Sequence, residues 1–164
     1  QMANIVTCIA NRGSYLTPHI VRPADPEHRA RIVRRDLNIR KEYFDVIADA
    51  MEEAVKGGTA RVAACDSVTV CGKTGTIQNP HGLDHSAFFA FAPKVNPKIA
   101  ILVYVENGEW GSTYGAPIAG LLIEKYLTGK ISSRKMALEK KMLEADLIHT
   151  PVKKTTDKRE EAED

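Results

Sequence analysis

Residues 68–76, with the sequence VTVCGKTGT, constrain the fold of this chain more than any other stretch. The β-branched residues and their alternation with other side chains predict a strand over residues 68–78. Residues two apart in a strand share a face, so Thr74 and Thr76 are expected to present their hydroxyls together. Lys73 begins on the opposite face and must curl round an edge of the sheet to join them.

Two glycines, Gly72 and Gly75, leave the backbone on either side of Thr74 without side chains. Glycine in a strand often marks a place where a ligand approaches the backbone closely. Two hydroxyl donors, one ammonium group and an unobstructed backbone N–H suit a substrate that carries a carboxylate and develops an oxyanion. The strand therefore predicts an edge that binds a carboxylate-bearing substrate.

The surroundings of the K-T-G triplet, Lys73-Thr74-Gly75, add to this signal. The segments that carry it are 1–4 (QMAN), 10–13 (ANRG), 18–21 (PHIV), 73–78 (KTGTIQ), 85–93 (HSAFFAFAP), 99–107 and 116–119 (APIA). Together they resemble the class B penicillin-binding proteins, in particular those of cell elongation, from residue 1 to about residue 127. The resemblance implies part of a penicillin-binding protein/serine β-lactamase-like transpeptidase fold.

The resemblance also implies roles for the residues of the triplet. Lys73 would set the local positive potential and join the proton network, and the hydroxyls of Thr74 and Thr76 would bind the terminal carboxylate of the substrate. The backbone N–H of Thr76 would be one oxyanion donor, and Gly75 would keep the edge clear. The substrates would be peptidoglycan stem peptides ending in D-Ala-D-Ala, β-lactam antibiotics would react in the same way, and no metal or organic cofactor is required.

Two further motifs of the family, S-x-x-K for the nucleophile and S-x-N for proton transfer, are expected before K-T-G. The one S-x-x-K match, Ser132-Ser133-Arg134-Lys135, follows K-T-G, and S-x-N does not occur in the sequence. We interpret the match as chance, with a serine acting as a helix N-cap. The chain is thus expected to be the C-terminal part of a transpeptidase domain, without its nucleophile and inactive alone.

The resemblance further implies a membrane glycosyltransferase of the elongation machinery as a partner. It places the parent protein at the periplasmic face of the bacterial inner membrane, held by an anchor outside this sequence. A penicillin-recognising sensor, a non-catalytic scaffold and a serine β-lactamase share the fold and remain alternatives. The net charge of +2 gives no reason to expect a nucleic-acid partner.

Two other readings of the motifs are weaker. A phosphate-binding P-loop needs a glycine at position 67, where the chain has Ser67, and a helix directly after the lysine. Cys65, Cys71, His81 and His85 superficially resemble zinc ligands, but their spacing differs from that of common zinc fingers. His81 is therefore expected in a loop and His85 at the start of a strand.

The rest of the chain predicts an α+β domain, an antiparallel sheet flanked by helices. Helices are expected over residues 5–9, ending at 11–13, over Lys41–Lys56, and over 116–127. Strands are expected over 15–21, at an edge, and over His85–Ala92 and 99–106, with a surface connection over 22–38. We divide the chain into a transpeptidase portion at 1–129, an amphipathic helical extension at 130–149 with a helix over 132–148, and a disordered charged tail at 150–164. Trp110 lies in the loop after the last strand, where packing on the domain is favoured over stacking on a substrate.

Overall fold

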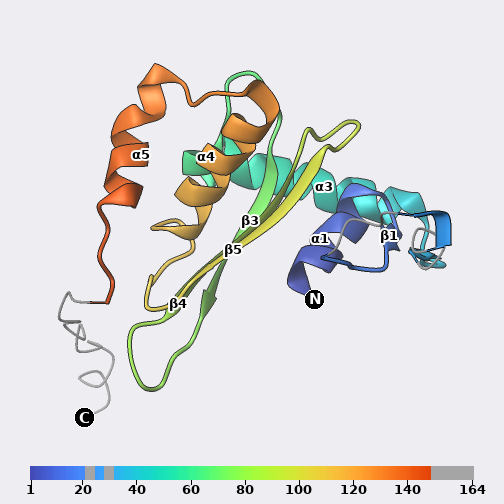
Figure 1. The fold of residues 1–164 in the computed structure, drawn as a ribbon, viewed down its shortest axis with the longest axis horizontal. Helices are drawn as coiled ribbons and strands as arrows, with labels where there is room; N and C mark the ends of the chain where they lie inside the picture. Colours follow the sequence, from blue (N-terminus) through green and yellow to red (C-terminus); the bar gives the residue numbers. More distant parts are fainter. Residues whose placement is uncertain (21–24, 28–31, 149–164) are drawn as a thin grey trace, which may run out of the picture.

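A computed structural model describes residues 1–20, 25–27 and 32–148 of the chain. The elements in chain order are α1 (Met2–Ala10), β1 (Ser14–Leu16), β2 (Arg34–Asp36), α3 (Lys41–Lys56), a short 3-10 helix η1 (Arg61–Ala63), β3 (Cys71–Ile77), β4 (His85–Ala92), β5 (Ile99–Val105), α4 (Gly115–Thr128), a second 3-10 helix η2 (Ser133–Lys135) and α5 (Met136–Leu143). Figure 1 shows the long strands side by side with helices around them, which confirms the α+β prediction.

The main sheet has the strand order β3-β4-β5 and is antiparallel throughout. Residue Thr74 lies opposite Phe88, and Thr76 lies opposite Ser86, so β4 pairs along the whole length of β3. This meander was predicted, and β4 has the predicted bounds. β3 is an edge strand within the described residues, and its outer side faces no other strand.

The two faces of the sheet have different helical covers. On one face, α4 packs against a core that includes Phe88, Ala90, Ala92, Val103, Ala116, Ala119 and Ile123. On the other face, α1 and α3 pack against Cys71 and Phe91 through Val6, Ala48 and Met51. Alternation along the strands separates these two sets, and β4 is buried on both faces, which accounts for its nearly continuous apolar sequence.

The helix ends follow local signals in the sequence. α1 ends at Ala10 with Asn11 as its C-cap, and Gly13 then adopts a φ of 104°, a left-handed conformation that favours glycine. α3 buries one stripe, Phe44, Ala48, Met51 and Val55, and has Gly57 as its C-cap. Both predictions are confirmed.

A small ribbon near the N-terminus differs from the prediction. The strand expected over residues 15–21 is limited to β1, and the expected surface connection over 22–38 contains β2, which pairs with β1. All three residues of β2 are exposed and charged. A strand without a buried face has no alternation of polar and apolar residues, and the sequence pattern therefore could not indicate it.

The strand expected over residues 68–78 begins later, at Cys71. The carbonyl of Thr69 accepts a hydrogen bond from the backbone N–H of Lys94 at 3.1 Å, outside the β3–β4 ladder. Residues 64–70 instead form a connection from η1 to β3. The β-branched residues Val68 and Val70 pack into the α4 core there without extending the strand.

The C-terminal part also departs from the prediction. α4 lies where a helix was expected and has Gly129, with a φ of 79°, as its C-cap. The single helix expected over 132–148 is replaced by η2 and the short α5. The predicted disordered tail at 150–164 lies outside the described residues. None of the helices described is both long and apolar enough to cross a membrane.

Candidate active site

The K-T-G triplet lies in the middle of β3, on the open edge of the sheet. Thr74 and Thr76 are two residues apart in a regular strand and therefore share a face, as predicted. Lys73 has an exposed side chain whose Nζ donates a hydrogen bond to the carbonyl oxygen of Thr74 at 2.8 Å. The lysine thus bends back along its own strand, and its ammonium group lies close to Thr74.

A residue that the sequence analysis missed contacts the triplet. The hydroxyl of Thr59 lies 2.9 Å from the hydroxyl of Thr74, within hydrogen-bonding distance. Thr59 follows Gly57 and Gly58, which were recognised only as the end of a helix. The turn brings Thr59 from α3 to the edge of the sheet, a tertiary contact that no local pattern indicates.

The two glycines of β3 have different surroundings. A β-carbon at Gly72 would overlap the ring of Phe88, so this glycine makes room for a core side chain. The interpretation of Gly72 as a mark of ligand approach is therefore wrong. At Gly75, a β-carbon would meet the side chain of Ala87 at an ordinary 3.6 Å. A side chain there would have room, and ligand approach at Gly75 stays a prediction.

The loop between β5 and α4 is fixed against the same part of the sheet. Ser86, which is fully buried, donates a hydrogen bond from its hydroxyl to the carbonyl of Trp110 at 2.8 Å and accepts one from the N–H of Gly115 at 3.0 Å. A β-carbon on Gly111 would lie 2.7 Å from the carbonyl oxygen of Gly75. The loop backbone therefore touches the backbone of β3 next to Thr76.

The prediction that Trp110 packs on the domain is wrong, because 66% of its surface is exposed.

His85 begins β4, and His81 lies in the preceding loop, as predicted. The Nδ1 atom of His85 accepts a hydrogen bond from the N–H of Asn107 at 3.0 Å, and its ring lies 5.4 Å from that of Tyr104. These contacts give His85 a structural role in joining the ends of β4 and β5.

The S-x-x-K match, residues 132–135, consists of η2 and the serine before it, and its contacts are with α4 and Cys65. Nζ of Lys135 lies 3.2 Å from Oε2 of Glu124, an ion pair without hydrogen-bond geometry, and 3.6 Å from the sulfur of Cys65. The other carboxylate oxygen of Glu124 accepts a hydrogen bond from the N–H of Ser132. The contacts of Lys135 are thus structural, which supports the interpretation that this S-x-x-K match arises by chance. The predicted N-cap is wrong, because the side chain of Ser132 makes no capping hydrogen bond.

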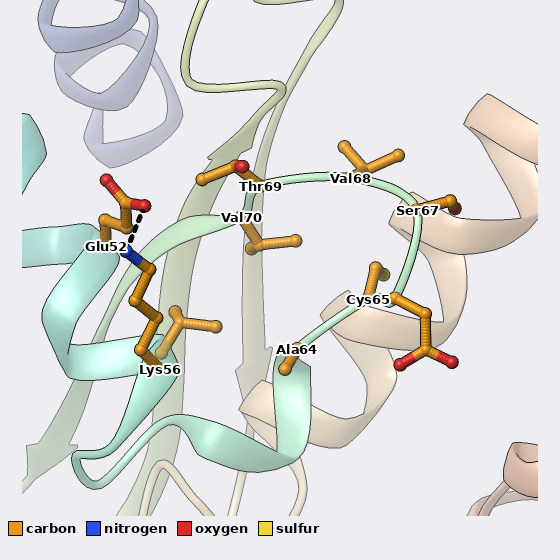
Figure 2. A pocket seen from close by; sticks show the side chains of 10 residues that line it. Glu52, Lys56, Ala64, Cys65, Ser67, Val68, Thr69 and Val70 are labelled. Atoms are coloured by element: carbon orange, nitrogen blue, oxygen red, sulfur yellow. Dashed lines mark ion pairs between the residues drawn. The ribbon is translucent and has the colours of Figure 1, made fainter.

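A cavity of about 250 Å³ lies between the end of α3 and the connection that leads into β3 (Figure 2). Figure 2 shows Glu52 and Lys56 at its rim, joined by an ion pair of 2.7 Å. Hydrogen bonds from Lys56 and then Lys94 lower the pKa of Glu52 below its usual value, although desolvation opposes them. No residue of the K-T-G triplet lines this cavity, so it is separate from the candidate site.

The three cysteines lie apart and form no disulfide. Burial raises the pKa of the Cys71 thiol to about 11, and burial also raises the pKa of Cys8 and of Cys65. Within the described ranges, no group of three or more histidine, cysteine, aspartate or glutamate side chains is arranged to hold a metal ion.

Comparison with known proteins assigns the chain to a family. The family model described as the penicillin binding protein transpeptidase domain matches residues 1–124. The chain therefore belongs to the penicillin-binding protein transpeptidase domain family.

Individual relatives agree with this assignment. The chain is 30% identical to the peptidoglycan D,D-transpeptidase MrdA of Haemophilus influenzae, over 80% of this chain and 24% of that protein. It resembles the crystal structure of Pseudomonas aeruginosa PBP2 in complex with WCK 5153, with a TM-score of 0.64 and 31% identity over 82% of this chain and 31% of that chain. A ceftriaxone acyl-enzyme complex of penicillin-binding protein A from M. tuberculosis gives a TM-score of 0.62 at 26% identity, over 76% of this chain and 31% of that chain. The chain spans about a quarter of the length of the curated relative.

Proposed function

We propose that the chain is the C-terminal part of the transpeptidase domain of a peptidoglycan D,D-transpeptidase similar to penicillin-binding protein 2. The observation that carries the proposal is the K-T-G strand on an open sheet edge, with the two threonine hydroxyls on one face and the ammonium group of Lys73 bound to the carbonyl of Thr74. Residues 1–129 supply this portion of the domain, and residues 130–149 are an extension, whose helix α5 contacts α4.

The complete enzyme would work by acyl transfer. A serine outside these residues attacks the carbonyl carbon of the D-Ala-D-Ala bond, the serine C–O ester bond forms, and the C–N bond breaks. The serine proton passes to the leaving amine of D-Ala. An amine of a second stem peptide then attacks the ester, forms the cross-link and returns a proton to the serine.

Each residue of the triplet has one role in this scheme. The hydroxyls of Thr74 and Thr76 hold the terminal carboxylate of the stem peptide, and the backbone N–H of Thr76 donates to the oxyanion. Lys73 stabilises the anionic substrate and takes part in proton transfer. Gly75 leaves the edge accessible. A β-lactam, with a carboxylate in a similar place, acylates the same serine, and no cofactor takes part.

Partners and location follow from the same proposal. The enzyme acts on peptidoglycan at the periplasmic face of the inner membrane, anchored through a segment outside this chain, and works with a membrane glycosyltransferase that supplies glycan strands.

Because the nucleophile is outside the chain, these 164 residues alone are inactive. A fluorescent penicillin should leave no covalent label on them in a denaturing gel, and a label on Ser132 would contradict the proposal.

The test of the site uses the complete transpeptidase. The substitution Thr76→Val keeps the β-branched shape and removes the hydroxyl. A hydrogen bond to a charged group contributes about 1.5–3 kcal/mol, so penicillin acylation should slow on the order of ten- to a hundredfold. The loss should shrink for a ligand whose carboxylate is esterified. Acylation at the wild-type rate, or an equal loss with the ester, would show that Thr76 does not bind the carboxylate.

A further inference from the structure

Cys65 is the cysteine of this chain that lines a cavity. It lies on the connection from η1 to β3, in the wall of the cavity of about 250 Å³ at the end of α3 (Figure 2). The side chains of Cys8 and Cys71 are buried instead, with 7% and 0% of their surfaces exposed. All three cysteines lie in the described part of the chain and carry free thiols. The cavity therefore gives small solutes a route to one thiol of the three.

A lysine lies next to the sulfur of Cys65. Nζ of Lys135 donates a hydrogen bond to Sγ of Cys65 at 3.6 Å, and it lies 3.2 Å from Oε2 of Glu124. Glu124 is only 7% exposed, and this carboxylate oxygen has no hydrogen-bond partner within the described residues. Sulfur is a weak hydrogen-bond acceptor. The ammonium group of Lys135 therefore lies between two neighbours without a strong hydrogen bond to either of them.

The distance between Sγ and Nζ suits an oxygen atom bound to the sulfur. Such an oxygen can lie within hydrogen-bonding distance of Nζ without a movement of Cys65 or Lys135. Oxygen accepts hydrogen bonds more strongly than sulfur does, and a sulfenate oxygen also carries a negative charge opposite the ammonium group. The lysine is thus placed to stabilise an oxidised form of Cys65 more than the thiol.

We propose that Cys65 is a site of reversible oxidation by small peroxides, and that Lys135 binds the resulting sulfenate. The thiolate sulfur attacks one oxygen of hydrogen peroxide, the S–O bond forms and the O–O bond breaks. The sulfur loses two electrons to the peroxide, and the departing hydroxide takes up the thiol proton and leaves as water. Neither residue belongs to the K-T-G triplet, so this site goes beyond the proposed function and does not rest on it.

The rate of oxidation should depend on pH through the thiol. Burial is the main cause that raises the pKa of Cys65, and of the charged groups that act on it, Lys135 on η2 lowers the pKa whereas Glu124 on α4 raises it. Because the thiolate is the form that reacts, oxidation should be slow at pH 7 and faster at pH 9. An equal rate at both pH values would contradict attack by the thiolate.

The experiment treats the complete transpeptidase with hydrogen peroxide in the presence of dimedone, which reacts with sulfenic acids. The protein is then unfolded, its remaining thiols are alkylated with N-ethylmaleimide, and the peptides are quantified by mass spectrometry. Cys65 should lose its free thiol and carry dimedone, whereas Cys8 and Cys71 should be alkylated. Dithiothreitol in place of dimedone should restore the Cys65 thiol, because a sulfenic acid is reversible. A Cys65 thiol that persists, or equal oxidation of all three cysteines, would overturn the proposal.

The role of Lys135 is tested by Lys135→Met, in which loss of the Cys65 thiol should slow at least about fivefold, the effect of one lost charge contact. Lys140→Met removes an exposed lysine of α5 and should leave the rate unchanged. Because Lys135→Met leaves the Glu124 carboxylate without a cation, the double variant Lys135→Met/Glu124→Gln and the melting temperatures are measured as well. The double variant should also be oxidised more slowly than the wild type. A rate equal to or above that of the wild type in the double variant would show that Lys135 does not assist the oxidation.

Discussion

The hydroxyl oxygens of Thr59 and Thr74 are 2.9 Å apart, although the two residues belong to different elements of the chain. Thr59 lies in the turn after α3, and Thr74 is the central residue of the K-T-G triplet. Such a pair orients the Thr74 hydroxyl, because a hydroxyl that shares a hydrogen bond has a defined direction for its proton or lone pair. The turn after α3 thus contacts the candidate site.

Loss of this contact should weaken the site without abolishing it. In the complete transpeptidase, Thr59→Val removes the partner hydroxyl and keeps the shape of the side chain. An exposed neutral hydrogen bond contributes about 0.5–1.5 kcal/mol, so acylation by benzylpenicillin should slow about two- to tenfold. Thr59→Ser keeps the hydroxyl and should retain the wild-type rate. A Thr59→Val enzyme with normal kinetics would show that Thr74 is oriented without it.

Removal of the charge on Lys73 should be at least as damaging as Thr76→Val. The substitution Lys73→Met keeps a long flexible side chain and deletes the ammonium group beside Thr74. Acylation should slow by more than about tenfold, because a charge-assisted contact with an anionic ligand is lost. Thermal denaturation should be nearly unchanged, since the Lys73 side chain is exposed. A large drop in the melting temperature with normal acylation would mean that Lys73 has a structural role instead.

The Glu124–Lys135 pair should make stability depend on pH in the acidic range. Burial alone would raise the pKa of Glu124, but the hydrogen bond with Ser132 and the charge on Lys135 together hold the pKa below its usual value. A lowered folded-state pKa stabilises the protein above the unfolded value of about 4.3, and this stabilisation is lost as the pH falls through the folded value.

The measurement is denaturant unfolding of the complete domain at pH 7 and at pH 3. The wild type should lose more stability than Glu124→Gln between these two conditions, because the variant has no carboxylate to protonate. Equal losses would show that Glu124 does not titrate differently in the folded protein. Hydrogen exchange in α5, which follows Lys135, should increase in the variant already at pH 7.

Gly111 should tolerate no side chain. A β-carbon there would press on the backbone of Gly75 at 2.7 Å and on the carbonyl of Ala87, and neither can move away without a shift of the sheet or the loop. Gly111→Ala should therefore destabilise the domain by about 1–3 kcal/mol and slow acylation. Gly57→Ala is the matched control, because a β-carbon at Gly57 meets nothing within 4 Å and its φ is −138°. Similar behaviour of both variants in unfolding experiments would contradict the close approach.

Much of this fold could be predicted from the sequence, because its signals are local. The stripe of α3, the glycines after α1 and α4, and the apolar run of β4 each report burial or backbone conformation within a few residues. The β1–β2 ribbon could not be predicted, since its second strand is exposed on both faces. The start of β3 was placed too early because β-branched residues favour both a strand and a buried connection.

The site was predictable to a lesser degree. The sequence itself places Lys73, Thr74 and Thr76 close together, and the alternation of side chains in a strand defines the face on which each of them lies. Thr59 comes to this edge only through a turn that the tertiary structure determines. Gly72 was misread for the same reason, since its neighbour Phe88 lies on another strand.

The contact between Gly72 and Phe88 has a consequence for how β3 and β4 align. A slip of one residue in an antiparallel pair turns every side chain of a strand to the opposite face of the sheet. In β3 it would turn the hydroxyls of Thr74 and Thr76 toward α1 and α3, and it would bring Lys73 to the face that α4 covers. The ring of Phe88 occupies the space that a side chain at position 72 would need. A slip that brought a neighbouring residue of β3 with a side chain to this place would therefore cause a clash. The Phe88 ring therefore permits only one alignment of β3 with β4. The face on which the side chains of the K-T-G triplet lie thus depends on a fully buried core residue.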